Sequence, residues 1–446
     1  MSSDWETCKL GDLGRIVTGK TPKTSESINF GGQIPFVTPT DMDGRKTISS
    51  TARYLTHTGA SSVKGSIIPS GSVMVSCIGS DMGKSVVAGK DCVTNQQINS
   101  IVVNKKFDHG FVYYNLSMRK SELQHHASGG STMPILNKGH FSELDITLPS
   151  LSEQRLISGF LSTLDDRITL LRETNTTLEA IAQALFKSWF VDFDPVRAKQ
   201  EGREPEGMDA DTAALFPDCF EESELELVPK GWKVRSIGDV ACNHSSTFNF
   251  SKTDKVIFIN TSDVSDGVFL HANYSLKDQL PGQAKKTIQN DDILFSEIRP
   301  KNRRFAYVNF DSKDYVVSTK FMILRVTGSM HPRYLYQILR QYETIEHFNI
   351  IAESRSGTFP QITFDSINKF KVVEPSQECM LKYIECISPI IKKIDLITQH
   401  QKLLETLRDT LLPRLISGQL RLPDAENILG NNGIKKEKLV PCIVVK

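Results

Sequence analysis

The chain has 446 residues, of which 39% are hydrophobic and 24% charged, and its formal net charge is +1. This length predicts two to four domains, each able to bury its own core. We find no apolar run long enough to span a membrane, and the polar N-terminus does not resemble a signal peptide. The eight cysteines contain no CxxC pair, which argues against a zinc site or a disulfide framework and favours a cytoplasmic location.

The small net charge averages segments of opposite sign. Residues 1–150 contain 15 Lys/Arg and 12 Asp/Glu, residues 191–227 contain 3 and 12, and residues 229–374 contain 20 and 15. Two mildly basic blocks therefore flank an acidic segment. A basic block favours an anionic partner, but an excess of this size does not by itself indicate nucleic acid.

The first block, residues 1–151, carries the local signals of an α+β domain. Short runs of β-branched and aromatic residues, bounded by Gly, Pro, Asn and Asp, predict strands such as Ser72–Ile78 and Ser100–Val103. The spacing of apolar residues over Phe111–His125 predicts one helix.

Residues 152–190 contain no proline and a single glycine and predict one long helix. Its apolar positions alternate in steps of four and three residues, which is typical of a coiled-coil seam. At about 1.5 Å per residue the helix would be roughly 58 Å long. Such a helix needs a partner for its apolar stripe.

The acidic segment 191–228 is predicted to be a linker, and its charge would repel DNA. Trp189, Phe190 and Phe193 lie beside it, and we expect them to be exposed at the end of the long helix. Two roles stay open for these aromatics. They could anchor a partner subunit, or they could cap the seam against another helix.

The second block, residues 229–376, repeats the first. Trp5 and Gly11 recur as Trp232 and Gly238, at an offset of 227 residues. Ile34–Asp41 aligns with Val256–Asp263, and the Gly130–Pro134 segment aligns with Gly357–Pro360 with one residue less. In the second block we expect strands at Val256–Ile259, Ile293–Ile298, Arg304–Asn309 and Phe321–Val326, and a helix over Pro332–Phe348. An internal duplication explains the whole pattern.

An offset of 226 carries residues 152–190 onto 378–416, within the predicted partner helix 377–416. The amide Asn175 then aligns with Gln401, and a buried amide in a coiled coil fixes register. Two antiparallel helices would place the blocks at opposite ends, as in a symmetric dimer that reads two half-sites on duplex DNA. Residues 417–446 are expected to form a tail. The predicted seam comprises Leu161, Leu164, Ile168, Leu171, Asn175, Leu178, Ile387, Ile390, Ile394, Ile397, Gln401 and Leu404.

Four segments in a fixed order resemble the specificity subunit of type I restriction–modification systems. They are Leu148–Gln154 at the helix entry, Leu185–Pro195 at its end, Val228–Trp232 opening the second half, and Leu411–Leu420 near the close. The resemblance covers residues 5–422. Residues 425–446 run past the usual ending of the family.

The resemblance implies two α/β target recognition domains in tandem, joined by two long antiparallel coiled-coil helices. Each domain would read one half of a bipartite sequence on double-stranded DNA. The helices would set the spacing and dock two modification (methyltransferase) subunits, and restriction/translocase subunits would complete the assembly. S-adenosylmethionine, ATP and Mg²⁺ would be bound by those partners, so that this chain would hold no cofactor and perform no catalysis.

Catalytic and metal-binding signals are weak in the sequence itself. Gly79–Ser85 has three residues between its glycines where a phosphate-binding P-loop needs four, so a turn between strands is the better interpretation. The adjacent His125 and His126 lack the spacing of metal ligands on one helix face. We therefore predict neither a catalytic residue nor a metal site.

The strongest candidate for DNA contact is the basic run Arg299–Arg304, predicted at a hairpin tip, because arginine can contact guanine with two hydrogen bonds. Its counterpart in the first block is the Gly79–Lys84 loop, with different side chains. Further polar loops could supply amides for adenine or cations for phosphate, although ordinary turn capping is the alternative for each. The candidates are Lys20, Thr21, Lys23, Lys84, Asn95, Gln96, Gln97, Ser131, Thr132, Arg299, Lys301, Asn302, Arg303, Arg304, Lys320, Arg355, Thr358 and Gln361.

These features favour a non-catalytic DNA-recognition subunit. The alternative is a coiled-coil scaffold whose globular ends bind proteins and have no DNA specificity. Salt dependence separates the two, because binding through several phosphates weakens steeply as salt rises.

Overall fold

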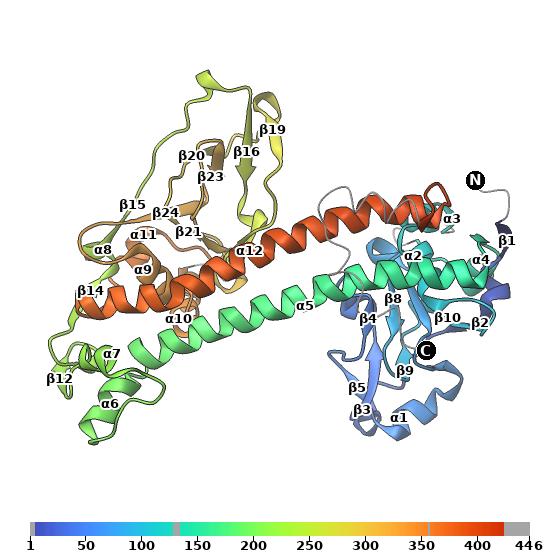
Figure 1. Cartoon of the computed structure of the whole chain (residues 1–446), viewed down its shortest axis with the longest axis horizontal. Helices are drawn as coiled ribbons and strands as arrows, with labels where there is room; N and C mark the ends of the chain where they lie inside the picture. Colours follow the sequence, from blue (N-terminus) through green and yellow to red (C-terminus); the bar gives the residue numbers. More distant parts are fainter. Residues whose placement is uncertain (1–4, 128–133, 356, 423–446) are drawn as a thin grey trace. The chain divides into compact units, whose positions relative to one another are not determined.

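The computed structural model describes residues 5–127, 134–355 and 357–422 (Figure 1). The chain divides into two compact units. Unit 1 consists of residues 1–175 and 396–446, and unit 2 of residues 176–395. The two long helices, α5 (Leu151–Phe190) and α12 (Gln377–Ile416), each contribute to both units. Their bounds differ by at most one residue from those expected from the sequence.

Unit 1 contains two principal sheets and a two-stranded ribbon of β1 (Glu6–Lys9) with β11 (Asp145–Leu148). The first sheet has the order β2-β10-β7-β8-β4, and the second has the order β5-β3-β9-β6. Their bounds are β2 Gly14–Thr18, β10 Ile98–Val103, β7 Val73–Ser76, β8 Ser85–Ala88, β4 Thr47–Ile48, β5 Tyr54–Leu55, β3 Phe30–Val37, β9 Cys92–Thr94 and β6 Ile67–Ile68. The short helices are α1 His57–Ser62, α2 His109–Ser117, α3 Lys120–His126 and α4 Lys138–Ser142.

Unit 2 repeats this plan with sheets β15-β24-β21-β22 and β19-β16-β23-β20 and the ribbon β14-β25. Their bounds are β15 Ala241–Asn243, β24 Phe321–Val326, β21 Ile293–Ser296, β22 Phe305–Tyr307, β19 Tyr274–Leu276, β16 Lys255–Ile259, β23 Tyr315–Ser318, β20 Ala284–Thr287, β14 Lys233–Ser236 and β25 Lys371–Glu374. It also has a small hairpin of β17 (Val264–Ser265) and β18 (Val268–Phe269). Its helices are α8 Ile237–Val240, α9 Pro332–Leu339, α10 Tyr342–Arg355 and α11 Phe364–Ile367.

The duplication predicted from the sequence is present at the level of strand pairing. The parallel pair β3–β9 corresponds to β16–β23, and the antiparallel hairpin β7–β8 corresponds to β21–β22. The turn after β3 is closed by Asp41, whose Oδ2 accepts from the backbone N of Thr38 at 2.8 Å. In the second copy Asp263 does the same for Asn260, also at 2.8 Å. The aligned segments therefore fold alike.

Three expectations about these elements need correction. Each predicted block helix is two helices: α2 and α3 in place of Phe111–His125, and α9 and α10 in place of Pro332–Phe348. After α2, the hydroxyl of Ser117 donates to the carbonyl of Tyr114 at 2.9 Å and competes with helix continuation. After α9, Arg340 is turned inward to an ion pair with Glu179.

The acidic segment is folded and is not an extended linker. It forms α6 (Asp194–Gln200), α7 (Ala210–Ala214) and the hairpin of β12 (Phe220–Ser223) and β13 (Glu226–Pro229). Val196 and Phe216 from this segment are buried in the core of unit 2. Its carboxylates stand on the outside, which explains why composition alone suggested a linker.

The expected exposure of Trp189, Phe190 and Phe193 is wrong. All three are buried in the core of unit 2, and so they are not available for the predicted contact with a partner subunit. The Trp189 and Phe190 rings lie 5.9 Å and 5.1 Å from the ring of Tyr383 on α12. They therefore fill the alternative role of capping the seam between the helices.

The two long helices pack against each other within each unit, and the order of their contacts is antiparallel. In unit 1, Asp165 pairs with Arg408 at 2.9 Å and Arg172 with Glu405 at 2.5 Å, so the partner number falls as the α5 number rises. In unit 2 the Tyr383 hydroxyl of α12 donates to the carbonyl of Ala182 on α5 at 3.5 Å. The seam residues Leu161, Leu164, Ile168, Leu171, Ile387, Ile397 and Leu404 are buried, and Leu178, Ile390 and Ile394 are half-buried.

The two seam amides do not act as a matched pair. Asn175 donates across the seam to the Thr398 hydroxyl at 3.0 Å. Gln401 instead donates along its own helix to Glu405 at 3.1 Å. Asn175 alone therefore makes the cross-helix hydrogen bond that the sequence suggested for both.

In the described part of the chain, no helix has the length and apolar character needed to cross a membrane. The seven cysteines that the structure describes are free thiols. No cluster of His, Cys, Asp or Glu in the described ranges has the arrangement of a metal site.

Candidate nucleic-acid interface

In unit 1, four segments that are distant in sequence meet at one edge of the sheets. The tip of the β7–β8 hairpin contains Gly79, whose backbone N donates to the carbonyl of Pro134 at 3.0 Å. The residue at the start of this tip, Cys77, donates to the carbonyl of Gln97 in the β9–β10 turn at 2.8 Å. Lys20 donates to the carbonyl of Thr94 at 2.9 Å and so adds the loop after β2. The described parts of these segments, residues 20–23, 77–84, 94–97 and 134, form one surface, which we call surface A.

Unit 2 builds the equivalent edge with the same backbone bonds. Arg299 in the β21–β22 tip donates to the carbonyl of Pro360 at 3.0 Å, as Gly79 does to Pro134. Glu297 donates to the carbonyl of Lys320 at 2.9 Å, as Cys77 does to Gln97. We call this edge surface B, and its loops are residues 297–304, 318–320 and 358–362. The framework of surfaces A and B is the same, and the side chains differ.

The cations of surface A are exposed. Lys84 forms an ion pair with Asp81 at 2.8 Å, and Lys23 pairs with Glu26 at 3.2 Å. Lys20 is exposed at the start of the same loop. Exposed pairs of this kind are worth little to stability. Lys84 and Lys23 can therefore exchange their carboxylate partners for a phosphate at low cost.

The amides of surface A shape the β9–β10 turn. The buried Asn95 donates to the Gln97 side-chain oxygen at 3.0 Å and accepts from the Gln97 backbone N at 3.1 Å. Gln96 is exposed, and its oxygen accepts from the Thr21 hydroxyl at 2.7 Å. Of the three predicted amides, Gln96 is thus the best placed to reach a base. Ser131 and Thr132 lie outside the described residues.

The basic tip of surface B holds its arginines in different ways. Arg299 and Arg303 both have positive φ angles, +46° and +52°, so the loop turns sharply around the buried Pro300. Arg299 is exposed, with its guanidinium 5.7 Å from the Phe359 ring. Arg303 is half-buried and pairs with Asp266 at 2.9 Å. Lys301 and Asn302 are exposed and Arg304 is half-buried. Arg299 and Lys301 are therefore the exposed cations of the tip.

The remaining candidates of surface B fall into two groups. Lys320 lies 3.9 Å from Glu297, and Thr358 and Gln361 border the tip. Arg355 is turned toward the start of α11, where it donates to Ser366 at 2.5 Å and to Thr363 at 3.3 Å. We therefore assign Arg355 to holding that helix start.

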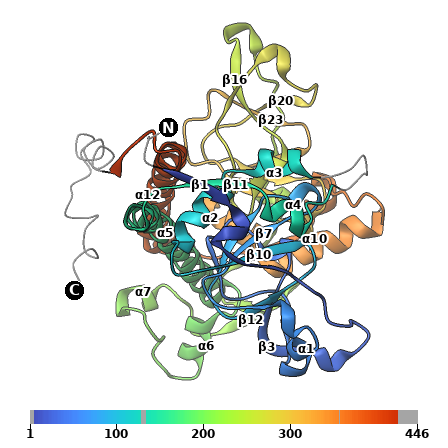
Figure 2. The same ribbon diagram turned by 90° about the vertical axis from the view of Figure 1, so that its right-hand side faces the viewer.

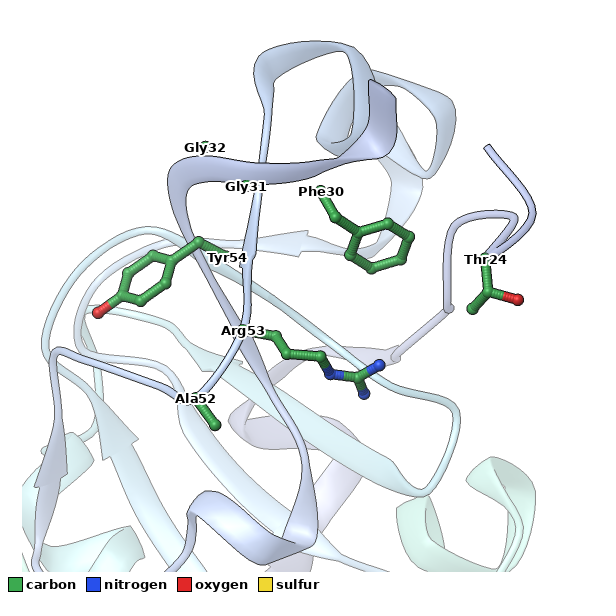
Figure 3. A pocket seen from close by; sticks show the side chains of 7 residues that line it. All are labelled: Thr24, Phe30, Gly31, Gly32, Ala52, Arg53 and Tyr54. Carbon is green, nitrogen blue, oxygen red and sulfur yellow. The ribbon is translucent and has the colours of Figure 1, made fainter. Parts of the chain in front are cut away.

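A pocket of about 490 Å³ in unit 1 was not predicted from the sequence (Figure 3). It opens beside the Lys20–Lys23 loop and is lined by Thr24, Phe30, Gly31, Gly32, Ala52, Arg53 and Tyr54. The Arg53 side chain runs below the Phe30 ring toward Thr24, and its guanidinium lies 5.2 Å from the Phe36 ring. A single arginine before a two-residue strand has no periodic signal. The repeat offers the one clue, because Tyr54 and Tyr274 both open the equivalent strands β5 and β19.

Comparisons with known proteins identify the class to which this double architecture belongs. A family model described as the type I restriction modification DNA specificity domain matches residues 2–180 and 229–406. The two matches correspond to the two repeats. The chain belongs to this family of type I restriction–modification specificity proteins.

Individual relatives agree with this assignment. The specificity subunit of the type I restriction enzyme MjaIX from Methanocaldococcus jannaschii is 25% identical over 94% of both chains. The HindI specificity subunit from Haemophilus influenzae is 46% identical over 40% of this chain and 39% of its own length. The crystal structure of a type I S subunit from M. genitalium has the same fold, with a TM-score of 0.57, 14% identity, and coverage of 93% of this chain and 96% of that one.

The chain is thus a specificity subunit, the DNA-recognition component that works with the other subunits of such a system, and it is not itself an enzyme. The rival interpretation, a scaffold without DNA specificity, does not hold. The resemblance inferred from the four sequence segments is confirmed.

Proposed function

We propose that surface A reads one half of a bipartite DNA target and surface B reads the other. The observation that carries this proposal is the shared backbone framework with different side chains at its tips. Two identical surfaces would read the same half twice. Two frameworks with different tips suit two different half-sites.

The chemistry of the tips suits both kinds of DNA contact. Arginine can form two hydrogen bonds to guanine in the major groove, and one such pair discriminates by about 1–3 kcal/mol. Arg299 is exposed and held over an aromatic ring, which limits the freedom it would lose on binding. The lysines of surface A and Lys301 of surface B suit phosphate contacts, which position a protein without reading sequence.

In this proposal the partner subunits perform the catalysis. Two modification subunits would dock on α5 and α12, and each would flip and methylate an adenine, because a base inside a duplex is out of reach of an active site. S-adenosylmethionine, ATP and Mg²⁺ would be bound by the modification and restriction/translocase subunits. We place the assembly in the cytoplasm, in keeping with the free thiols of the described cysteines.

Mapping methylated bases in cells that carry only this restriction–modification system tests the proposal. The expected motif has two short specified halves separated by unspecified bases. A continuous motif in a cell with active modification would contradict the reading of one half-site by each unit.

A further inference from the structure

A buried arginine in unit 2 joins the helix α5 to the recognition loop. Arg340 follows α9 and is only 7% exposed. Its Nη1 lies 2.7 Å from Glu179 Oε2 on α5, and its Nη2 lies 4.0 Å from Asp266 Oδ1 in the β17–β18 turn. Tyr336 packs against the guanidinium, with its ring centroid 5.5 Å away. One buried cation therefore bridges two acidic groups from separate elements.

The Asp266 end of this bridge belongs to the tip of surface B. The same Asp266 carboxylate accepts from Arg303 at 2.9 Å. The backbone N of Asp266 donates to the carbonyl of Arg303 at 2.7 Å, and Gly267 donates to Phe305 at 2.9 Å. The β17–β18 turn is thus hydrogen-bonded to the start of β22, the second strand of the β21–β22 hairpin. A continuous path runs from Glu179 through Arg340 and Asp266 to Arg303.

Unit 1 contains a corresponding connection with different chemistry. Lys46 lies after the Asp43–Gly44 turn, the counterpart of Asp266–Gly267, and Gly44 and Gly267 have φ angles of +94° and +90°. The carbonyl of Lys46 accepts from Val87 in the β7–β8 hairpin at 2.7 Å. Its ammonium donates to the Ser162 hydroxyl on α5 and lies 4.9 Å from the centroid of the Tyr114 ring. Figure 2 shows α2, which carries Tyr114, beside α5.

We propose that Lys46 and Arg340 are positioning residues, each fixing the recognition hairpin of its own unit on α5. Neither would contact a base. Each would hold the hairpin at one angle to the helix on which the rest of the assembly is built. The inference rests on the proposed reading of one half-site by each unit.

The burial of these cations supports a positioning role over a phosphate contact. Arg340 has its guanidinium enclosed by Glu179, Asp266 and Tyr336, so little of it remains for solvent or DNA. Lys46 is half-buried, with its ammonium on the Ser162 hydroxyl and the Tyr114 ring, and this burial lowers its pKa despite the opposing effect of Asp165, Asp166 and Asp108. A buried cation that loses its partners raises the free energy of the folded chain. Each cation therefore favours the one arrangement of hairpin and helix in which its partners are in place.

The test compares methylation motifs of Lys46→Met and Arg340→Met in the complete system, expressed in cells. We expect Arg340→Met to raise methylation at sites mismatched in one half of the motif by about tenfold or more, with the other half still strict. Lys46→Met should relax the opposite half. Arg340→Lys and Lys46→Arg keep the charge and should restore most of the discrimination.

Matched controls separate positioning from folding. Arg235→Met removes an arginine of the same unit that pairs with Glu374 at 3.6 Å on the β14–β25 ribbon, and it should leave both halves strict. Glu179→Gln preserves side-chain size and should relax the same half as Arg340→Met, even where the methionine variant folds poorly.

Three outcomes are decisive. If the wild-type motif is bipartite and the variants still discriminate strictly in both halves, this inference is overturned and the proposed function is not. An equal loss of sequence discrimination in both halves, together with a lower yield of soluble complex, also overturns it, because a purely structural role would have this effect. A continuous wild-type motif instead overturns the proposed function on which the inference rests.

Discussion

Arg299 and Arg303 lie four residues apart in the same loop, yet their guanidinium groups have different surroundings. Arg303 is tied to Asp266, whereas Arg299 is exposed above the Phe359 ring. The sequence shows four cations in six residues and ranks none above the others. Their separation into anchoring and presenting residues depends on Asp266, which lies in a different part of the chain.

Arg299→Ala is expected to weaken binding of the assembled complex to its DNA target by about 1–3 kcal/mol. The physical reason is the loss of an exposed, pre-oriented guanidinium. A salt-titrated fluorescence anisotropy experiment measures the effect. Arg203→Ala, which removes an exposed arginine paired with Glu201 in the folded acidic segment, is the matched control and should bind as the wild type does. Equal affinities for wild type and Arg299→Ala would show that the residue does not touch DNA.

The long helices are the elements that the sequence predicts best, because a seam repeats its signal every few residues over their whole length. The pairing of Asn175 was less accessible. Sequence alignment sets it opposite Gln401 in the repeat, but the side chain bonds to Thr398, whose position depends on how the two helices are offset. The burial of Trp189 and Phe190 was also missed, since the acidic residues that follow them conceal the core contacts of α6 and α7.

Asn175→Leu is expected to raise the thermal unfolding temperature of the full chain. The Asn175 side-chain oxygen is buried without a hydrogen-bond partner in the described residues, at a seam position whose neighbours are apolar. Leucine would replace one cross-helix hydrogen bond with apolar contact, and a polar seam residue costs stability. Differential scanning calorimetry measures the change. Thr163→Leu at an exposed position of the same helix is the control, and a lower unfolding temperature for Asn175→Leu alone would show that the amide is a net stabiliser.

At the scale of the whole molecule, the duplication was accessible from the sequence because framework residues such as Asp41 and Asp263 recur at a fixed offset. The composition of surfaces A and B was accessible only in part. The separate loops could be named, but backbone bonds such as Gly79 to Pro134 bring together residues more than fifty positions apart. The Arg53 pocket could not be predicted from the sequence, since its lining comes from three separated segments and the recurrence of Tyr54 as Tyr274 is the one clue to it.

The helices are expected to act as a spacing device. Adding one heptad to α5 after Asn175 and one to α12 before Leu396 lengthens both by about 10 Å, or roughly three base pairs of DNA. The unspecified spacer of the motif should lengthen by about that amount, with both halves unchanged. Methylation mapping measures the result, and altered half-sites with an unchanged spacer would contradict a spacing role.

The most direct test of the central claim is a chain in which residues 5–150 are replaced by a copy of residues 232–376, so that both units carry surface B. Methylation mapping with the complete system measures its motif. If each unit reads one half-site, the half read by surface B remains and the other half is replaced by a second copy of it. Persistence of the original first half in an active, soluble complex would contradict the claim.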